Sequence, residues 1–539
     1  MMRIYRLGTA RPSTKDLLDS AARLFEIADG DDYQLTDGPE RLRLQSRSHL
    51  VELSLASGGI WAADQTQLFN PNLHPELPRV EDTLGLARDF VESRALLPKL
   101  EGPASWGGLV EAGTRLATLS DGQRAEVELD RQVVFPVTVD GLPVVGGGGD
   151  FTLVLGDGGQ PIGFHGVWRE LLDAFEVETI SSEQSEEEYR KNFQGLSLKL
   201  ESVTSFLAYY SAPVSENQEF LFPVHVMGGT ARVGDQIIPL RKAMLPATEF
   251  GPKPDRVEPE PKRTARTKPS EEDRNEQLHA RRNYMAQTGA ENLLSLHASA
   301  NPWEAGASWI GVSGGLSGSK KNAQGFIDQW RADGWNINFN WGDANAWESD
   351  WRRNDDTWVD AADFVFYTGH ASMNGWTLAS PDDGGLLFSE VGAAPSNPGD
   401  LWGQNDLEWV TIAACGPLQD DILSSGGGNV LNRWDGAFDG LHLLMGYGAI
   451  TFDNESEGRQ LAKYAREGQT LKDAWFRTAK EIQPATNGAS APDGPTVWVG
   501  LMWATKSGID PINDHAWSHG SVSADPSSPT GLACMWTVC

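Results

Sequence analysis

Two apolar runs, each followed by a reactive side chain, constrain this chain most. Ala362–Ser372 is rich in aromatic and β-branched residues and closes with Gly-His-Ala-Ser, and Glu408–Leu418 is built the same way and closes with Cys-Gly-Pro-Leu. Such runs are typical of strands that are covered on both faces in a parallel sheet. Ligands gather at the carboxyl ends of strands in open α/β sheets, so neighbouring strands would place His370 beside Cys415 at one edge.

This pair of side chains has a chemical rationale. A free thiol has a pKa of about 8.5 and is mostly protonated at neutral pH, and a neighbouring imidazole can take its proton. Backbone N–H groups of Ala371 and Cys415 would stabilise a developing oxyanion. The structural alternative is a cysteine that serves as a small buried hydrophobe, with a histidine that only packs. The two residues together, each closing a strand, favour a catalytic dyad.

A third block strengthens the pattern. Gly440–Thr451 contains a run ending in Gly-Tyr-Gly-Ala-Ile-Thr, a predicted helix covers Ser456–Glu467, and Gly468–Trp475 reads Gly-Gln-Thr-Leu-Lys-Asp-Ala-Trp. The order of the three blocks, over about Ala305–Thr505, resembles the caspase-like (clan CD) cysteine peptidases, and the CHAT, gingipain and clostripain types most. The 45-residue separation of the His and the Cys suits that group.

The resemblance implies both a fold and an activity. We expect a C-terminal α/β/α caspase-like sandwich with a mostly parallel central sheet. The implied reaction is hydrolysis of peptide bonds in a protein or peptide substrate, with Cys415 as the nucleophile and His370 as the general base. Two rivals remain: a peptide ligase or cyclase that uses the same dyad, and a non-catalytic caspase-like scaffold for binding or assembly. The 20 tryptophans suit a binding surface.

Two positions depart from the family pattern. Ala371 stands where the family usually has Gly, although its backbone N–H is retained. Ala413, two residues before the Cys, stands where relatives often carry an acid or Gln that lines the specificity pocket. Acidic residues elsewhere could replace that group, or could be ordinary loop and capping residues: Asp343, Asp350, Asp420 and Asp421. We take Ala413, Asp343 and Asp420 as the predicted substrate pocket.

The first half of the chain has a different pattern. Helix-like and alternating segments over residues 1–250 predict an α+β region of two or three helix-plus-sheet modules, and about Leu84–Ile162 resembles the FTP and PepSY propeptide modules. A Pro- and charge-rich linker is predicted at residues 251–290. The peptidase domain would span residues 291–510, followed by a tail at 511–539. The resemblance implies a zymogen whose N-terminal region packs on the peptidase domain.

Composition excludes some classes of partner. A net charge of −31 argues against nucleic acid, since phosphate binding depends on Lys and Arg, and against an anionic membrane surface. We find no run of about 18 apolar residues and no signal peptide, so we expect a soluble protein, cytoplasmic rather than secreted. Cys534 and Cys539 would either form a small disulfide or remain free thiols.

The loop Trp341–Trp358 combines four tryptophans with four aspartates. It could form a substrate groove, a cation site, or an aromatic-capped loop whose acids face water. We expect no cofactor or metal, and leave calcium open on account of this loop.

Overall fold

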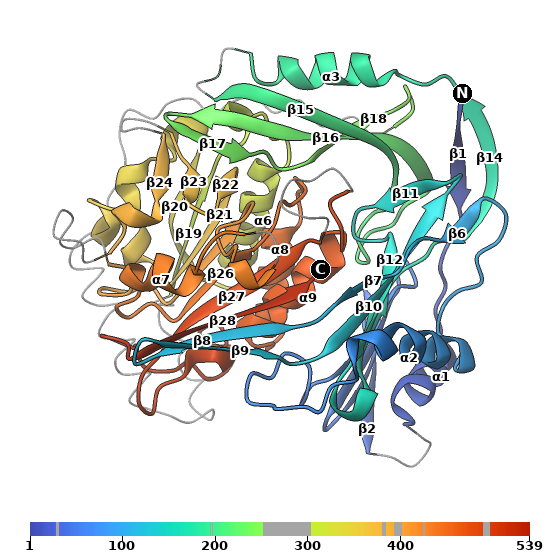
Figure 1. The fold of residues 1–539 in the computed structure, drawn as a ribbon, viewed down its shortest axis with the longest axis horizontal. Coiled ribbons are helices and arrows are strands. Elements are labelled where there is room, and N and C mark those ends of the chain that lie inside the picture. The colour runs from blue at the N-terminus through green and yellow to red at the C-terminus, as the bar shows by residue number, and fades with distance from the viewer. Residues whose placement is uncertain are drawn as a thin grey trace.

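The computed structural model describes residues 1–27, 32–194, 196, 198–251, 303–379, 384–392, 401–423, 426–488 and 496–539. Nearly all of the predicted linker, residues 252–290, therefore lies outside the described residues. Two large sheets dominate the described chain, and Figure 1 shows the N-terminal sheet extending along two sides of the C-terminal one.

The N-terminal sheet is almost entirely antiparallel. Its main strand order is β14-β1-β16-β15-β11-β10-β12-β13-β5-β4-β3-β2, and β6, β7, β17 and β18 pair at its sides. In chain order its strands are β1 (Met2–Leu7), β2 (Tyr33–Asp37), β3 (Arg41–Ser46), β4 (His49–Ser54), β5 (Ile60–Asp64), β6 (Ala104–Trp106), β7 (Val110–Ala112), β10 (Arg131–Val139), β11 (Leu142–Val145), β12 (Asp150–Leu155), β13 (Pro161–Gly166), β14 (Leu171–Val177), β15 (Lys199–Tyr210), β16 (Phe220–Val233), β17 (Gln236–Pro239) and β18 (Ala243–Pro246).

Three helices accompany this sheet: α1 (Thr14–Phe25), α2 (Val80–Ser93) and α3 (Ser182–Lys191). Helix α1 begins at a capping box between Ser13 and Asp16, which satisfies N–H groups that have no partner within the helix. Its buried residues recur at helical spacing and join those of α2 in one core against the sheet. Helix α3 lies over β15 and β16 (Figure 1).

The C-terminal sheet has the order β20-β19-β21-β25-β26-β27-β28-β8-β9. Its first five strands run parallel, and from β26 onward each neighbour is antiparallel. The strands are β8 (Arg115–Ser120), β9 (Gln123–Glu128), β19 (Glu304–Trp309), β20 (Asn336–Gly342), β21 (Phe364–Thr368), β25 (Trp409–Ala413), β26 (Leu443–Tyr447), β27 (Trp498–Thr505) and β28 (Gly531–Val538).

The two faces of this sheet are covered differently. One face packs on helices α6 (Ser319–Ala332), α8 (Glu457–Arg466) and α9 (Leu471–Ile482). The other is covered by an aromatic cluster that includes Trp351, Trp376 and Trp434, together with the short helix α7 (Val430–Trp434) and a small sheet. That small sheet contains β22 (Ala371–Ser372), β23 (Gly375–Thr377) and β24 (Gly385–Leu387).

The predicted fold class is therefore wrong. Strands in large mixed sheets dominate the described chain, and the C-terminal part is not an α/β/α sandwich around a mostly parallel sheet. Four of its nine strands are antiparallel additions at one side, and aromatic side chains and short strands replace a second helical layer. Apolar strands that are buried on both faces look the same in sequence whichever direction their neighbours run.

A hairpin from the first half of the chain completes this sheet. Strand β8 pairs with β28 through six register pairs, from Gly531↔Ser120 to Trp536↔Arg115, and β9 pairs with β8. The two halves of the chain thus share one sheet.

Two further observations concern the cysteines and the helices. Cys534 and Cys539 are both free and buried, so the disulfide alternative is not realised. Residues five apart on an extended chain point to opposite faces, and Cys534 lies within β28. No helix in the described part of the chain is long and apolar enough to cross a membrane.

Candidate functional site

Two adjacent strands bring His370 and Cys415 to the same edge of the C-terminal sheet. Strands β21 and β25 are parallel neighbours in a register that pairs Thr368 with Ala413. His370 and Cys415 each follow two residues later. They therefore leave the sheet at the same level, at the carboxyl ends of its strands.

The imidazole of His370 is held at both nitrogens. Its Nε2 lies 2.8 Å from the carbonyl oxygen of Gly314, and its Nδ1 lies 3.2 Å from the backbone nitrogen of Arg241. A carbonyl only accepts and a backbone N–H only donates, so Nε2 carries the proton and Nδ1 has the free electron pair. Burial lowers the pKa of His370 to about 4, with a smaller lowering from Arg241, so the ring is neutral at neutral pH.

The thiol of Cys415 is also fully buried. The backbone N–H of Thr451 points at its Sγ at 3.4 Å, and the Thr451 hydroxyl oxygen lies 3.7 Å away. Two residues were predicted to stabilise an oxyanion through their backbone N–H groups. One is Cys415 itself. The other, Ala371, directly follows His370 and is the first residue of β22, where it pairs with Trp376.

The side chain of Arg241 fills a polar pocket at the same edge. Arg241 comes from the N-terminal region, between β17 and β18, and is 0% exposed. Its five guanidinium N–H groups meet five acceptors: Thr368 Oγ1 at 2.9 Å, the Ala413 carbonyl at 2.9 Å, Thr451 Oγ1 at 3.1 Å, the Phe452 carbonyl at 2.7 Å and Glu457 at 3.2 Å. The pocket thus satisfies every donor of a guanidinium.

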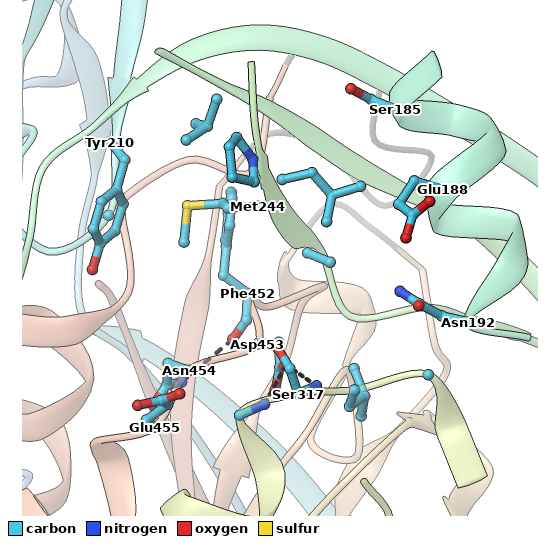
Figure 2. Close-up of a pocket in the computed structure, with 18 of the residues that line it drawn as sticks. Ser185, Glu188, Asn192, Tyr210, Met244, Ser317, Phe452, Asp453, Asn454 and Glu455 are labelled. Carbon is cyan, nitrogen blue, oxygen red and sulfur yellow. Dashed lines mark hydrogen bonds between the residues drawn. The ribbon is translucent and has the colours of Figure 1, made fainter. Parts of the chain in front are cut away.

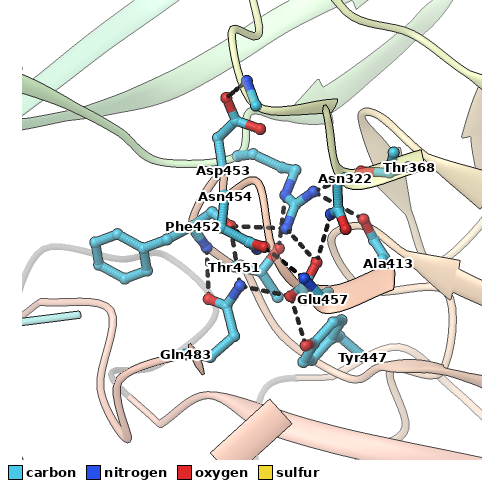
Figure 3. A network of polar contacts seen from close by, with 12 residues as sticks. Asn322, Thr368, Ala413, Tyr447, Thr451, Phe452, Asp453, Asn454, Glu457 and Gln483 are labelled. Carbon is cyan, nitrogen blue, oxygen red and sulfur yellow. Dashed lines mark hydrogen bonds and ion pairs between the residues drawn. The ribbon is translucent and has the colours of Figure 1, made fainter. Parts of the chain in front are cut away.

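Glu457, at the first position of α8, is the anionic partner in this pocket. Tyr447 and Gln483 donate to its Oε1, each at 2.7 Å, and Asn322 donates to its Oε2 at 3.1 Å. Figure 3 shows these side chains converging with Thr368, Ala413 and Thr451 around the guanidinium. Burial lowers the pKa of Arg241, but Glu457 and Asp453 outweigh it, so that the pKa lies above its ordinary value. The guanidinium of Arg241 therefore carries its charge.

The segment that carries Arg241 is bound like an extra strand. The N–H of Lys242 donates to the Thr451 carbonyl, and the N–H of Asp453 donates to the Lys242 carbonyl, both at 2.8 Å. Lys242 and Phe452 accordingly form a parallel β-bridge. Main-chain hydrogen bonds of this kind are how a site holds an extended peptide.

A cavity of about 1260 Å³ adjoins this segment. Ser185, Glu188 and Asn192, on and just after α3, face Met244 of β18 and Asp453 across it (Figure 2). Asp453 accepts hydrogen bonds from the N–H groups of Ser317 and Gly318. The cavity thus borders the strand edge from which residues 451–453 hold the Arg241 segment.

The three residues of the predicted substrate pocket lie in different places. Ala413 contributes its carbonyl to the Arg241 pocket. Asp343 accepts from the N–H groups of Gly311 and Ser313, and so holds the turn that presents the Gly314 carbonyl to His370.

Asp420 lies away from the pocket and binds the β8–β9 hairpin. It accepts two hydrogen bonds from Arg124 and one each from the N–H groups of Ile422 and Val430. Burial raises its pKa, but Arg124 and these N–H groups outweigh it and leave the pKa below its ordinary value.

Sequence reasoning did not identify Arg241 and Glu457. Arg241 sits in an apolar run, Ile-Ile-Pro-Leu-Arg-Lys-Ala-Met-Leu-Pro, and Glu457 opens a predicted helix in a conventional place for an acid. The signal that could have identified Arg241 was the basic pair Arg241-Lys242 in the middle of an apolar run.

Two groups of carboxylates have the spacing that a cation needs. They are Glu304, Asp363 and Asp406, and Asp355, Asp356 and Asp360. In the second group, Asp360 accepts from the N–H groups of Gly403, Asn405 and Leu407, and burial raises its pKa to about 7. These contacts give Asp360 a role in holding the loop. Three of the four tryptophans of the loop contribute to the aromatic cluster: Trp341, Trp351 and Trp358.

Comparison with known proteins adds one match. Residues 304–538 match a family described as a domain of unknown function, DUF6345. No curated protein matches the chain. The matched range contains His370, Cys415 and Glu457, whereas Arg241 precedes it.

Proposed function

We propose that this protein is a cysteine peptidase of the Cys–His type, in a latent form in which its own N-terminal region covers the site. The observation that supports this most is a peptide N–H, that of Arg241, directed at the free electron pair of His370 Nδ1 at 3.2 Å. This hydrogen bond places a backbone amide of an extended segment within reach of the candidate general base.

The residues provide a complete cycle of bond making and breaking. His370 Nδ1 takes the proton of Cys415, and the thiolate attacks the substrate carbonyl carbon to form a C–S bond. The C–N bond then breaks while His370 gives its proton to the leaving amine. Water, deprotonated by His370, attacks the thioester, releases the carboxylic acid and returns the proton to sulfur. The hydrogen bond from Nε2 to Gly314 fixes the tautomer that this cycle needs.

The closed state accounts for latency. His370, Cys415 and Arg241 are all 0% exposed, so no substrate reaches the thiol while the segment Leu240–Lys242 is in place. Activity requires that this segment withdraw from residues 451–453. Because the main-chain bonds there join two different parts of the chain, they can be replaced by those of a substrate.

The test is peptide hydrolysis by a chain whose covering segment is weakened. Arg241→Gln removes the ion pair with Glu457, and a mixed peptide library with mass-spectrometric detection reports any cleavage. We expect cleavage by Arg241→Gln and none by Arg241→Gln/Cys415→Ala. His370→Ala in the first background should lower the rate by about 100-fold or more.

Circular dichroism of each variant shows that the chains compared are folded. A folded Arg241→Gln chain that cleaves no peptide would contradict the proposal and favour a scaffold in which Arg241 only joins the two halves. Cleavage that persists without Cys415 would contradict the assignment of the nucleophile.

A further inference from the structure

The Arg241 pocket is built for a guanidinium rather than for a basic group in general. Five acceptors match five N–H donors, and they come from the ends of β21 and β25, from the segment after β26, and from helix α8. A lysine ammonium has three donors on a compact head, so it would leave carbonyl groups buried without partners. A neutral side chain would leave Glu457 as an uncompensated buried charge.

Besides the Arg241 side chain, backbone groups help to hold the segment in a way that does not depend on its sequence. Three such bonds join it to the C-terminal part: Arg241 N–H to His370, Lys242 N–H to Thr451, and Asp453 N–H to the Lys242 carbonyl. Any extended peptide with an arginine at the matching position offers the same groups.

The position of the pocket relates it to the chemistry. Thr368 and Ala413 each precede a dyad residue by two positions, and Thr451 contacts both the guanidinium and the Cys415 sulfur. A side chain bound here therefore fixes its own backbone beside His370 and Cys415.

We propose that this pocket is the primary specificity pocket of the enzyme, that its substrates are peptides with an arginine at the anchoring position, and that Arg241 occupies it as a built-in competitor. This inference rests on the proposed function for its catalytic meaning. The pocket's preference for a guanidinium can be measured without catalysis.

The binding experiment uses the full chain with Cys415→Ala, so that nothing is turned over. Arg241→Ala and, separately, Arg241→Gln vacate the pocket, and calorimetry measures the Kd of N-acetyl-arginine amide. N-acetyl-citrulline amide has nearly the same shape as the arginine ligand but no charge. N-acetyl-lysine amide has the charge but lacks the planar set of five N–H donors. We expect the arginine ligand to bind at least about 10-fold more tightly than either, which corresponds to about 1.4 kcal/mol.

Glu457 and an exposed neighbour provide matched variants. Glu457→Gln in the vacated chain should remove most of the preference for arginine over citrulline. Glu455→Gln, two residues earlier on a half-exposed side chain paired with Lys321, should leave it unchanged. If neither Arg241 variant folds alone, both are refolded with each ligand. Recovery with the arginine amide and not with the citrulline amide supports the proposal.

Equal affinity for the arginine and citrulline ligands, or equal failure to recover a folded chain, would overturn the inference. A separate arm restores Cys415 and measures hydrolysis of matched Arg, Lys and Leu peptides. Selective binding without hydrolysis of any peptide would contradict the proposed function and leave the pocket assignment intact. Hydrolysis of all three peptides without a preference for arginine would contradict the pocket assignment and leave the proposed function intact.

Discussion

At the scale of single residues, His370 connects chemistry with stability. Burial lowers its pKa to about 4, whereas an imidazole in the unfolded chain titrates near 6.5. Between these values the unfolded chain binds the proton and the folded chain does not. The contribution of His370 to stability is therefore present above about pH 6.5 and is lost as pH falls through about 4.

This shift predicts a pH-dependent difference between two chains. The free energy of unfolding of the wild type, minus that of His370→Gln, should fall by about 3 kcal/mol between pH 7 and pH 4. Urea unfolding at a series of pH values measures it. His74→Gln, at an exposed histidine, is the matched control and should follow the wild-type curve. Parallel curves for wild type and His370→Gln would contradict a buried neutral imidazole.

The dyad and its pocket differed in how far sequence could predict them. His370 and Cys415 were identified from the sequence because each follows the end of an apolar run, which is a local pattern. Glu457 and Arg241 were not, because their meaning comes from a contact between residues 216 positions apart. Asp420 illustrates the opposite error. Its closeness to Cys415 in sequence suggested a place in the substrate pocket, but its side chain binds Arg124, 296 positions away.

At the scale of elements, a charged contact adds to the strand pairing that holds the hairpin β8–β9. Arg124 joins β9 to Asp420 and also donates to Asn429, at the start of α7. Asp420 is buried, while the Arg124 side chain is 20% exposed. Loss of Arg124 would leave a buried carboxylate with only backbone donors.

Arg124→Met should therefore destabilise the chain by about 2 kcal/mol. It should also increase hydrogen exchange in β8 and β9 more than in β25 or β26, because the hairpin sits at the sheet edge. Arg190→Met, at an exposed pair with Glu186 on α3, should change stability by less than about 0.5 kcal/mol. Equal exchange throughout the C-terminal sheet would show that the hairpin is not locally held by Arg124.

Individual elements were largely predictable, and their arrangement was not. The predicted helix Ser456–Glu467 lies close to α8, and the two reactive runs contain β21 and β25. The antiparallel strands β27 and β28 and the added hairpin could not be placed, since apolar strands do not encode the direction of their partners. The aromatic cover in place of a helical layer also depends on long-range packing.

At the scale of the whole molecule, the N-terminal region does more than precede the C-terminal part. It donates two strands to the C-terminal sheet and places Arg241 in the pocket beside the dyad. The first contact is structural, and the second accounts for a buried thiol in a chain with a catalytic arrangement. Under the function that we propose, the same sequence contains the Cys–His site and the segment that covers it.

The most direct test of a covered Cys–His site is the reactivity of the three cysteines in one chain. All three are buried, and burial raises the pKa of Cys534 and Cys539, so these two serve as internal controls. Native alkylation by iodoacetamide at pH 7, mapped by peptide mass spectrometry, should label Cys415 at least about 10-fold faster in Arg241→Gln than in the wild type. His370→Ala should reverse that gain. A Cys415 that stays as unreactive as Cys534 in folded Arg241→Gln would contradict the account.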